Sequence, residues 1–326
     1  MTVPTLPAAH PASQARPVAD DAATPGSAEV AIPAAASLAV RAVLDGESRG
    51  VEVVASFPRA AYLTVGEDLL GLVTPDGVLL PNAVVLPAGA RPLASLHRGQ
   101  RGRVGDGLLD IGPLLVRVTR WWDPRPRLRP AARDVLGAAA RDVARSVGVR
   151  RGDPPAALAT PLAAVQIALI HGDADAALAA AARLVGFGPG LTPAGDDILC
   201  GVVSGVQLLA PAAAAADPDR ASIAAATDVA ALAAALGTAV ADLARHRTTA
   251  VSAALLRHAA RGEVADPASG LLRALTGHGD LVKATDELLA VGSTSGRDLT
   301  LGLLAAVDVV MRVVVAGDHP PVGRAS

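Results

Sequence analysis

The chain has 326 residues, of which 51% are hydrophobic but only 2% aromatic, and its formal net charge is −2. This length accommodates two domains, or one large domain with a tail, and the core must be built from Ala, Val and Leu. Small side chains let helices approach closely, which favours a helix-rich body. The interspersed charges lack the clustered basic face of a nucleic-acid-binding protein, and the single Cys200 excludes an internal disulfide and a multi-cysteine metal site.

Residues 1–36 are dominated by Ala, Pro, Ser and Thr, a composition that cannot bury enough apolar surface to offset the entropy of ordering. We therefore predict a disordered leader. The amino terminus lacks the basic region and apolar core of a secretory signal. The best membrane candidate, residues 299–316, carries Asp308 and Arg312, and its uninterrupted apolar runs are too short to span a bilayer. We expect a cytoplasmic protein with no membrane and no nucleic-acid partner.

Residues 37–127 have the pattern of a β-rich domain, because short runs rich in Val and Leu alternate with turn residues. Asp76-Gly77, between two apolar runs, is a strong signal for a β-hairpin. Several short strands punctuated in this way indicate a small sandwich or barrel. The predicted strands are residues 51–56, 61–65, 69–74, 78–80, 83–86 and 114–119.

The prolines after Trp121-Trp122 end this pattern, and residues 128–318 follow a helical period instead. The predicted fold class is therefore α+β, with a small β-rich domain followed by a larger, mostly α-helical domain that carries glycine-rich motifs. Residues 221–245 are predicted as one long helix or a helix pair. The other predicted helices are residues 131–147, 161–170, 174–185, 192–209, 248–261, 271–276, 281–291 and 297–316.

The most informative stretch is residues 186–201, where three glycines and a proline within five residues exclude regular structure. Thr192 then has the character of a helix N-cap, with Pro193 at the first helical position. A glycine loop that enters a helix amino terminus predicts an anion site formed by backbone N–H groups. The adjacent Asp196 and Asp197 either cap this helix or hold a cation. The alternative is a tight turn and a well-capped helix with no ligand.

Two further polar clusters precede predicted helices. Ser295 and Asp298 resemble a capping box, although the run of three hydroxyls between Gly292 and Gly296 also suits an oxygen-rich ligand. Thr248 and Ser252 share one helix face and follow a basic triplet, residues 245–247, which suits either a carboxylate or phosphate site or a solvated helix end. No GxSxG elbow, Walker loop, dinucleotide fingerprint or HExxH spacing is present.

Three segments, residues 188–197, 248–262 and 291–298, resemble the AllH-like family, formerly a domain of unknown function. The resemblance spans roughly residues 38–316. It implies a subunit of an oxamate carbamoyltransferase-like complex in purine (allantoin) nitrogen catabolism, where oxalurate and phosphate become oxamate and carbamoyl phosphate. It also implies partner subunits, including an acyl-CoA-synthetase-like protein. The alternative is a non-catalytic metabolite-binding or scaffolding subunit, so whether the chain is itself an enzyme stays open.

Carbamoyl transfer to phosphate requires two anions to be held together and an oxyanion to be stabilised, a task for preorganised N–H groups and hydroxyls. We expect the helix starts at Thr192, Thr248 and Ser295 to converge on one pocket. Asp196 and Asp197 would there bind Mg²⁺ or position an amide or ammonium group. The candidate catalytic residues are Asp196, Asp197, Ser295 and Asp298, and the candidate substrate-binding residues are Gly188, Gly190, Thr192, Gly195, Thr248, Ser252, Thr294 and Gly296.

Overall fold

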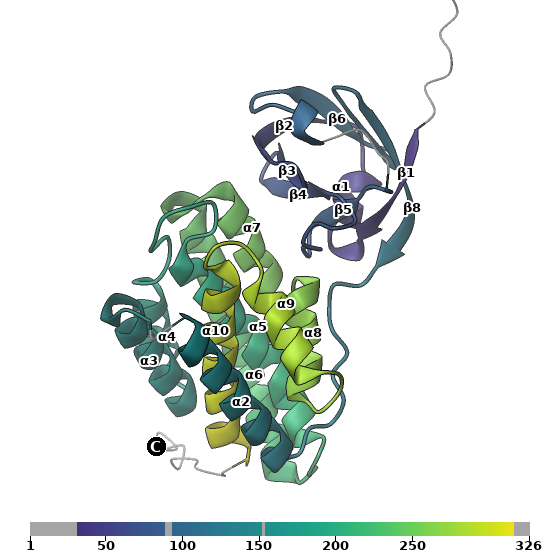
Figure 1. Cartoon of the computed structure of the whole chain (residues 1–326). Coiled ribbons are helices and arrows are strands. Elements are labelled where there is room, and N and C mark those ends of the chain that lie inside the picture. Colours follow the sequence, from purple (N-terminus) through teal and green to yellow (C-terminus); the bar gives the residue numbers. More distant parts are fainter. Residues whose placement is uncertain (1–30, 89–92, 152–153, 316–326) are drawn as a thin grey trace, which may run out of the picture. The chain divides into compact units, whose positions relative to one another are not determined.

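The amino-terminal part of the described chain is a closed β-barrel (Figure 1), seen in a computed structural model that describes residues 31–88, 93–151 and 154–315. Its strands follow the order β1-β5-β4-β3-β2-β6-β7-β8 around the barrel, and β1 closes it by pairing in parallel with β8. The bounds are β1 Ile32–Ser37, β2 Arg49–Ser56, β3 Ala60–Val65, β4 Asp68–Val73, β5 Ala83–Val85, β6 Arg101–Gly105, β7 Leu108–Ile111 and β8 Leu114–Trp122, with a short helix α1 at Arg41–Leu44.

Alternation of side chains along the strands fills the barrel. In β3, Ala61, Leu63 and Val65 are fully buried, while the residues between them are partly exposed. Strand β4 is buried on both faces, because Leu70 and Leu72 point into the barrel core and Leu69 belongs to a separate apolar cluster that includes residues of a helix. The barrel is therefore a packed core rather than a pore.

Two sequence predictions in this region are wrong. Strand β1 occupies residues that we placed in the leader, because Pro33 and the small residues around it pair along an entire edge of β8. Residues 1–30 of the predicted leader lie outside the described residues. Asp76-Gly77 forms a turn, but residues 78–80 do not return as a strand, and β4 pairs in parallel with β5 instead. The reason is tertiary: the Leu79 carbonyl accepts a hydrogen bond from the Asp266 N–H, 2.9 Å away, in the helical region.

The second part of the chain is a helical body (Figure 1). A helix occupies each predicted position, although the helices predicted to start at residues 161 and 271 start at residues 156 and 266. Residues 220–247 form one helix rather than a pair. The bounds are α2 Arg133–Arg151, α3 Ala156–His171, α4 Ala174–Ala181, α5 Ala194–Ala214, α6 Arg220–Arg247, α7 Ala250–Ala259, α8 Asp266–Leu275, α9 Leu281–Leu289 and α10 Ser295–Val310, followed by a π-helical turn at Met311–Val315.

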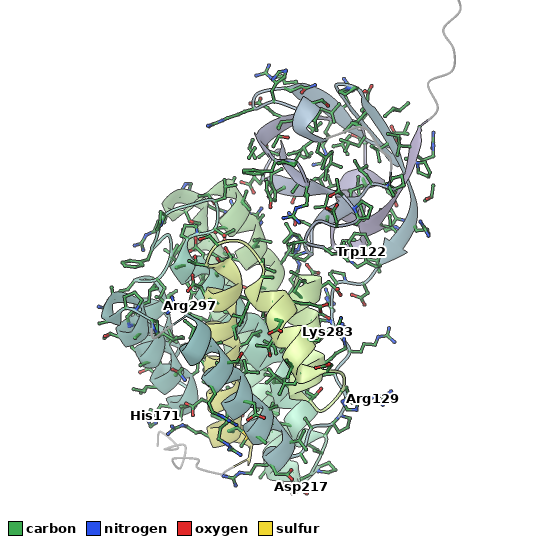
Figure 2. All side chains as sticks on the ribbon, viewed as in Figure 1. Trp122, Arg129, His171, Asp217, Lys283 and Arg297 are labelled. Atoms are coloured by element: carbon green, nitrogen blue, oxygen red, sulfur yellow. The ribbon has the colours of Figure 1, made fainter. Side chains whose placement is uncertain are left out.

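Helices α5 and α10 pack unusually closely at the centre of this body. A Cβ atom on Gly201 of α5 would collide with the Leu299 carbonyl of α10, and one on Gly302 of α10 would collide with the Ile198 carbonyl of α5. The two glycines therefore face each other across the crossing, where only hydrogen side chains fit. Lys283 of α9, labelled in Figure 2, has a side chain that is 70% exposed and pairs with Glu287.

Among the described residues, α5 and α6 are long and apolar enough to cross a membrane by length and composition alone. The most apolar window of α5 is 78% buried inside the protein, and that of α6 is 39% buried. Core helices meet the same criteria, so this finding is weak evidence for a membrane span. The segment that we singled out from the sequence, residues 299–316, is not among the two.

The predicted α+β class, with a strand-rich region followed by a mostly helical one, is confirmed. The barrel and the helices lie in one compact unit that begins at residue 31. The boundary that we placed at residue 127 remains a prediction.

Candidate functional site

The loop that leads into α5 depends on its glycines. Gly186, Gly188 and Gly190 have φ angles of +73°, +115° and +102°, a region that side-chain-bearing residues rarely adopt. At Gly186 a Cβ atom would also collide with the Arg247 carbonyl, whereas at Gly190 it would meet open space. The loop itself is exposed from Phe187 to Leu191. Gly188 and Gly190 therefore shape the backbone of the loop.

The start of α5 differs from the sequence prediction. Pro193 is the N-cap residue, the helix begins at Ala194, and no side chain caps it. The N–H of Gly195 donates to the Phe187 carbonyl at 2.9 Å, and the N–H groups of Asp196 and Asp197 donate to the Pro193 carbonyl at 3.0 and 3.2 Å. These three donors are therefore used inside the chain, and the anion site expected from the backbone N–H groups of this turn stays a prediction.

Asp196 serves the loop. Its side chain is 1% exposed and accepts hydrogen bonds from the Gly186 N–H, at 2.8 Å, and from the Thr248 hydroxyl. Burial raises the pKa of Asp196, and these two hydrogen bonds oppose the rise. Because both carboxylate oxygens already have donors, Asp196 joins the glycine loop to the residue that precedes α7. This gives it a positioning role.

Asp197 is different, because one of its oxygens is free. The side chain is 7% exposed, and its Oδ2 has no hydrogen-bond partner among the residues that the structure describes. Burial raises the pKa of Asp197 to about 8, helped by the charges of Asp298 and Asp196 and opposed by the nearby hydroxyls of Ser295 and Thr192. The carboxyl group is therefore largely protonated at neutral pH, and it has an unused hydrogen-bonding atom.

The hydroxyls of Thr192 and Ser295 meet beside Asp197, with their oxygens 2.7 Å apart. This contact joins the glycine loop to the start of α10 across more than a hundred residues of sequence. The capping box predicted for Ser295 and Asp298 is wrong, because Thr294 is the N-cap residue of α10 and no side chain caps this helix. Tertiary pairing with Thr192 takes the Ser295 hydroxyl away from its own helix.

The polar cluster at the start of α7, residues 248–252, makes two kinds of contact. Thr248 donates to Asp196, and Thr249 is the N-cap residue of α7, where its oxygen accepts the Ser252 N–H at 3.1 Å. The Thr249 hydroxyl also donates to the Leu191 carbonyl. Ser252 is 1% exposed, and its hydroxyl oxygen has no hydrogen-bond partner among the described residues. The start of α7 thus meets the glycine loop, as the start of α10 does.

Asp298 lies in the first turn of α10 and is 1% exposed. Neither of its oxygens has a hydrogen-bond partner among the described residues, and its Oδ1 lies 3.9 Å from Nη1 of Arg297. Burial raises the pKa of Asp298, while the Thr294 hydroxyl and the Arg297 charge oppose the rise. Gly296 is buried, and a Cβ atom there would collide with the Leu288 carbonyl.

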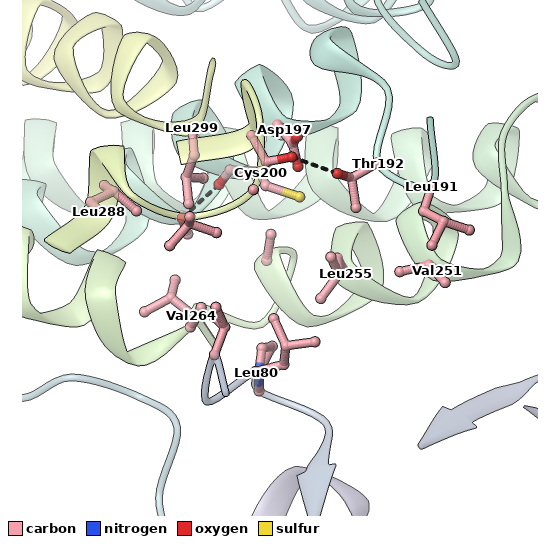
Figure 3. Close-up of a pocket in the computed structure, with 18 of the residues that line it drawn as sticks. Leu80, Leu191, Thr192, Asp197, Cys200, Val251, Leu255, Val264, Leu288 and Leu299 are labelled. Carbon is pink, nitrogen blue, oxygen red and sulfur yellow. Dashed lines mark hydrogen bonds between the residues drawn. The ribbon is translucent and has the colours of Figure 1, made fainter. Parts of the chain in front are cut away.

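A cavity of about 230 Å³ adjoins these residues. Of the predicted site residues, Thr192, Asp197 and Ser295 line it, and the other nine do not. Figure 3 shows Asp197 and Thr192 on one side of the cavity, and Leu80 and Val264 on the opposite side of this view. The remaining wall is mostly aliphatic, and its lining residues include no Lys, Arg or His. The three helix starts meet as a bonded network, but only two of them reach the cavity through a polar side chain.

Sequence reasoning missed a second acidic residue of the cavity wall, Glu263, which is 5% exposed. It pairs with His258 at 2.7 Å, with Arg261 at 2.9 Å and with Arg125 at 3.2 Å. Burial raises the pKa of Glu263, but hydrogen bonds from His258 and Arg261 outweigh that effect and hold the pKa at about 2. The spacing of His258, Arg261 and Glu263 around the end of α7 was the available signal.

The predicted Mg²⁺ site can be tested against these contacts. Mg²⁺ prefers ionised carboxylate oxygens in octahedral geometry. Both oxygens of Asp196 accept other hydrogen bonds, and the raised pKa of Asp197 favours its neutral form. The described residues contain no group of three or more His, Cys, Asp or Glu side chains that could hold a metal. The donor set does not fit the ion, so we derive no step through it.

Comparison with known proteins finds a family match for the segment that contains the glycine loop and the starts of α7 and α10. Residues 184–307 match the model of the family described as oxamate carbamoyltransferase subunit AllH, a description that implies a multi-subunit complex. The match begins just before the glycine loop, ends within α10 and leaves out the barrel. No solved structure is significantly similar to the chain. The AllH-like resemblance that the three motifs predicted is therefore confirmed for residues 184–307, the part of the chain that provides Thr192, Asp197 and Ser295.

Proposed function

We propose that this chain is the carbamoyl-binding subunit of an oxamate carbamoyltransferase-like complex, acting in the cytoplasm in purine or allantoin nitrogen catabolism. The observation that carries the proposal is the side chain of Asp197, a carboxyl group that burial keeps largely neutral and that lines the cavity beside the paired hydroxyls of Thr192 and Ser295. One of its oxygens, Oδ2, is buried without a partner among the described residues, an arrangement that costs about 1–3 kcal/mol.

A carbamoyl group matches this end of the cavity. Its carbonyl oxygen accepts a hydrogen bond from a protonated Asp197, and its NH₂ group donates to the hydroxyl oxygens of Thr192 or Ser295. A carboxylic acid that burial keeps neutral is an effective donor to an oxygen on which negative charge develops. When phosphate attacks the carbamoyl carbon, the new C–O bond forms as the C–N bond to oxamate breaks, and a proton goes to the departing nitrogen. Asp197 would stabilise the oxygen during that exchange.

The lining residues include no basic side chain, so the cavity has no cationic group to balance the charge of a bound phosphate. A dianion is poorly accommodated against aliphatic side chains without a cation. We therefore expect another subunit of the complex to present phosphate to the carbamoyl group. The same observation favours the second candidate function, a non-catalytic subunit that binds a carbamoyl metabolite and regulates or scaffolds its partners.

The deciding experiment measures phosphate-dependent turnover of oxalurate by the full chain, alone and with its partner subunits. For Asp197→Ala, which removes the donor, we expect kcat to fall by about 10²–10³-fold, the usual loss when one oxyanion donor is removed. Asp228→Ala, on the exposed face of α6, is the matched control. Unchanged turnover in folded Asp197→Ala would refute the catalytic assignment. Binding without turnover in any subunit combination would establish the second candidate.

A further inference from the structure

A second cavity, of about 310 Å³, lies along the linker that follows β8. Residues 122–127, which are the last residue of β8 and the start of this linker, line it together with residues of α8. Two backbone hydrogen bonds hold its walls together. The Val264 N–H donates to the Pro124 carbonyl at 3.1 Å, and the Asp266 N–H donates to the Leu79 carbonyl at 2.9 Å. The cavity is therefore large enough, and its walls are joined well enough, to bind a small molecule.

The charge of its lining distinguishes this cavity from the first. Three arginines, Arg125, Arg127 and Arg273, line it, whereas the lining of the first cavity includes no basic side chain. Two aspartates, Asp123 and Asp266, also line it, so its lining has an excess of one positive charge. Asp123 already accepts the Arg125 N–H at 2.9 Å, and Asp266 lies 4.0 Å from Arg273, too far for a hydrogen bond. The lining as a whole therefore favours an anionic ligand.

The three arginines keep most of their hydrogen-bond donors. A guanidinium group has five N–H donors, and the contacts inside the protein use only some of them. Arg127 is exposed and makes no hydrogen bond or ion pair with any residue that the structure describes. Arg125 donates through Nη2 to Glu263, and Arg273 donates through Nη1 to Ser269 at 2.6 Å. Unused donors from the linker and from α8 therefore meet at one cavity.

We propose that this second cavity binds a phosphate group, either as inorganic phosphate or as the phosphoryl end of a small phosphorylated ligand. A carboxylate presents two oxygens in one plane, which a single guanidinium fork satisfies. A phosphate group presents its oxygens in several directions, so it accepts hydrogen bonds from more than one arginine. The two cavities share only Val264 in their linings, and Asp197, Thr192 and Ser295 all line the first. The second site is therefore separate from the carbamoyl site and does not hold the phosphate that attacks the carbamoyl group.

The direct test is equilibrium dialysis of the full chain against radiolabelled inorganic phosphate at constant pH and ionic strength. Arg127→Gln removes one charge and most of the donors of one guanidinium group, so phosphate binding should weaken by about five- to tenfold. Arg129→Gln is the matched control, because Arg129, labelled in Figure 2, belongs to the same linker but does not line the cavity. It should change the affinity by less than about twofold. Equal losses in the two variants, or no phosphate binding by the original protein, would overturn the assignment.

A substitution of an acidic residue in the lining should have the opposite effect. Asp266→Asn removes a negative charge from the lining, so phosphate should bind about twofold more tightly or better. Asp228→Asn, on the exposed face of α6, should leave the affinity unchanged. Weaker or unchanged phosphate binding in folded Asp266→Asn would contradict the assignment. Asp197→Ala, in the first cavity, should not alter phosphate binding, and a loss there would show that phosphate binds in the first cavity instead.

Competition experiments identify the source of the phosphate group. Adenosine monophosphate is the probe for a phosphate ester, and acetate is the probe for a carboxylate. Tighter binding of adenosine monophosphate than of inorganic phosphate would support a phosphorylated ligand, and weaker binding would support inorganic phosphate itself. Acetate should displace the labelled phosphate at least about tenfold less effectively than unlabelled phosphate does. Equal displacement by acetate would contradict the recognition of a phosphate group.

Discussion

Asp197 makes the stability of the protein depend on pH in a way that one substitution should remove. Its pKa rises from a usual value of 3.8 to about 8 in the folded protein. The folded state therefore binds this proton more tightly than the unfolded state does. Between these two values only the folded state carries the proton, so stability falls as the pH rises, and it levels off above about 8.

The size of the effect follows from the shift. One pKa unit corresponds to about 1.4 kcal/mol, so the free energy of unfolding should fall by up to about 4 kcal/mol between about pH 5 and pH 8. Asp197→Asn keeps the shape of the side chain but cannot ionise, so its stability should vary much less over that range. Burial also raises the pKa of Asp196 and Asp298, and these groups contribute a slope of the same sign in both proteins.

The assay is urea unfolding followed by circular dichroism at several pH values from about 5 to 8. The free energy of unfolding of Asp197→Asn is subtracted from that of the original protein at each pH, and exposed Asp228→Asn serves as the control. We expect the difference to favour the original protein less and less as the pH rises. If the two stability curves run parallel, the Asp197 carboxyl group does not have a raised pKa and is ionised in the folded protein. The chemistry that we assign to it would then be wrong.

Three further predictions concern the supports of the site, each measured by urea unfolding at neutral pH unless stated. Thr248→Val should lower the free energy of unfolding by about 1–3 kcal/mol, because the buried Asp196 carboxylate loses a hydrogen-bond donor. Thr238→Val, on an exposed surface, should change it little, and equal effects of the two substitutions would contradict this reasoning. Gly302→Ala should lower the free energy of unfolding by about 3 kcal/mol or more, because the new methyl group collides with the backbone of α5. Gly270→Ala, with open space around it, should raise the free energy of unfolding by up to about 1 kcal/mol. An unchanged stability of Gly302→Ala would show that the helices separate easily. Glu263→Gln should lower the free energy of unfolding by about 3 kcal/mol at neutral pH, since the pKa of Glu263, about 2, lies below the usual 4.5. The difference from the original protein should vanish as the pH falls from about 4.5 to about 2, and a difference independent of pH would refute the role of the Glu263 charge.

The sequence by itself determined most of the helical body and the character of its key loop. Apolar residues at helical spacing located the helices from residue 133 onward, because an amphipathic pattern needs no knowledge of the partner surface. Gly186, Gly188 and Gly190 predicted an irregular loop, since the requirement for a positive φ is local. The three motifs also carried the family resemblance, which the match to residues 184–307 confirms.

Tertiary structure decided which polar groups remained available for chemistry. The Phe187 carbonyl accepts a hydrogen bond from the Gly195 N–H. The Ser295 hydroxyl is hydrogen-bonded to Thr192 and, contrary to the sequence prediction, does not cap its own helix. Two adjacent aspartates that look equivalent in the sequence differ in their surroundings. Both oxygens of Asp196 accept hydrogen bonds, whereas Asp197 lines a largely aliphatic cavity and keeps one buried oxygen without a partner among the described residues. Hydrogen bonding and desolvation depend on neighbours far away in the sequence, so no local pattern could have distinguished these two carboxyl groups.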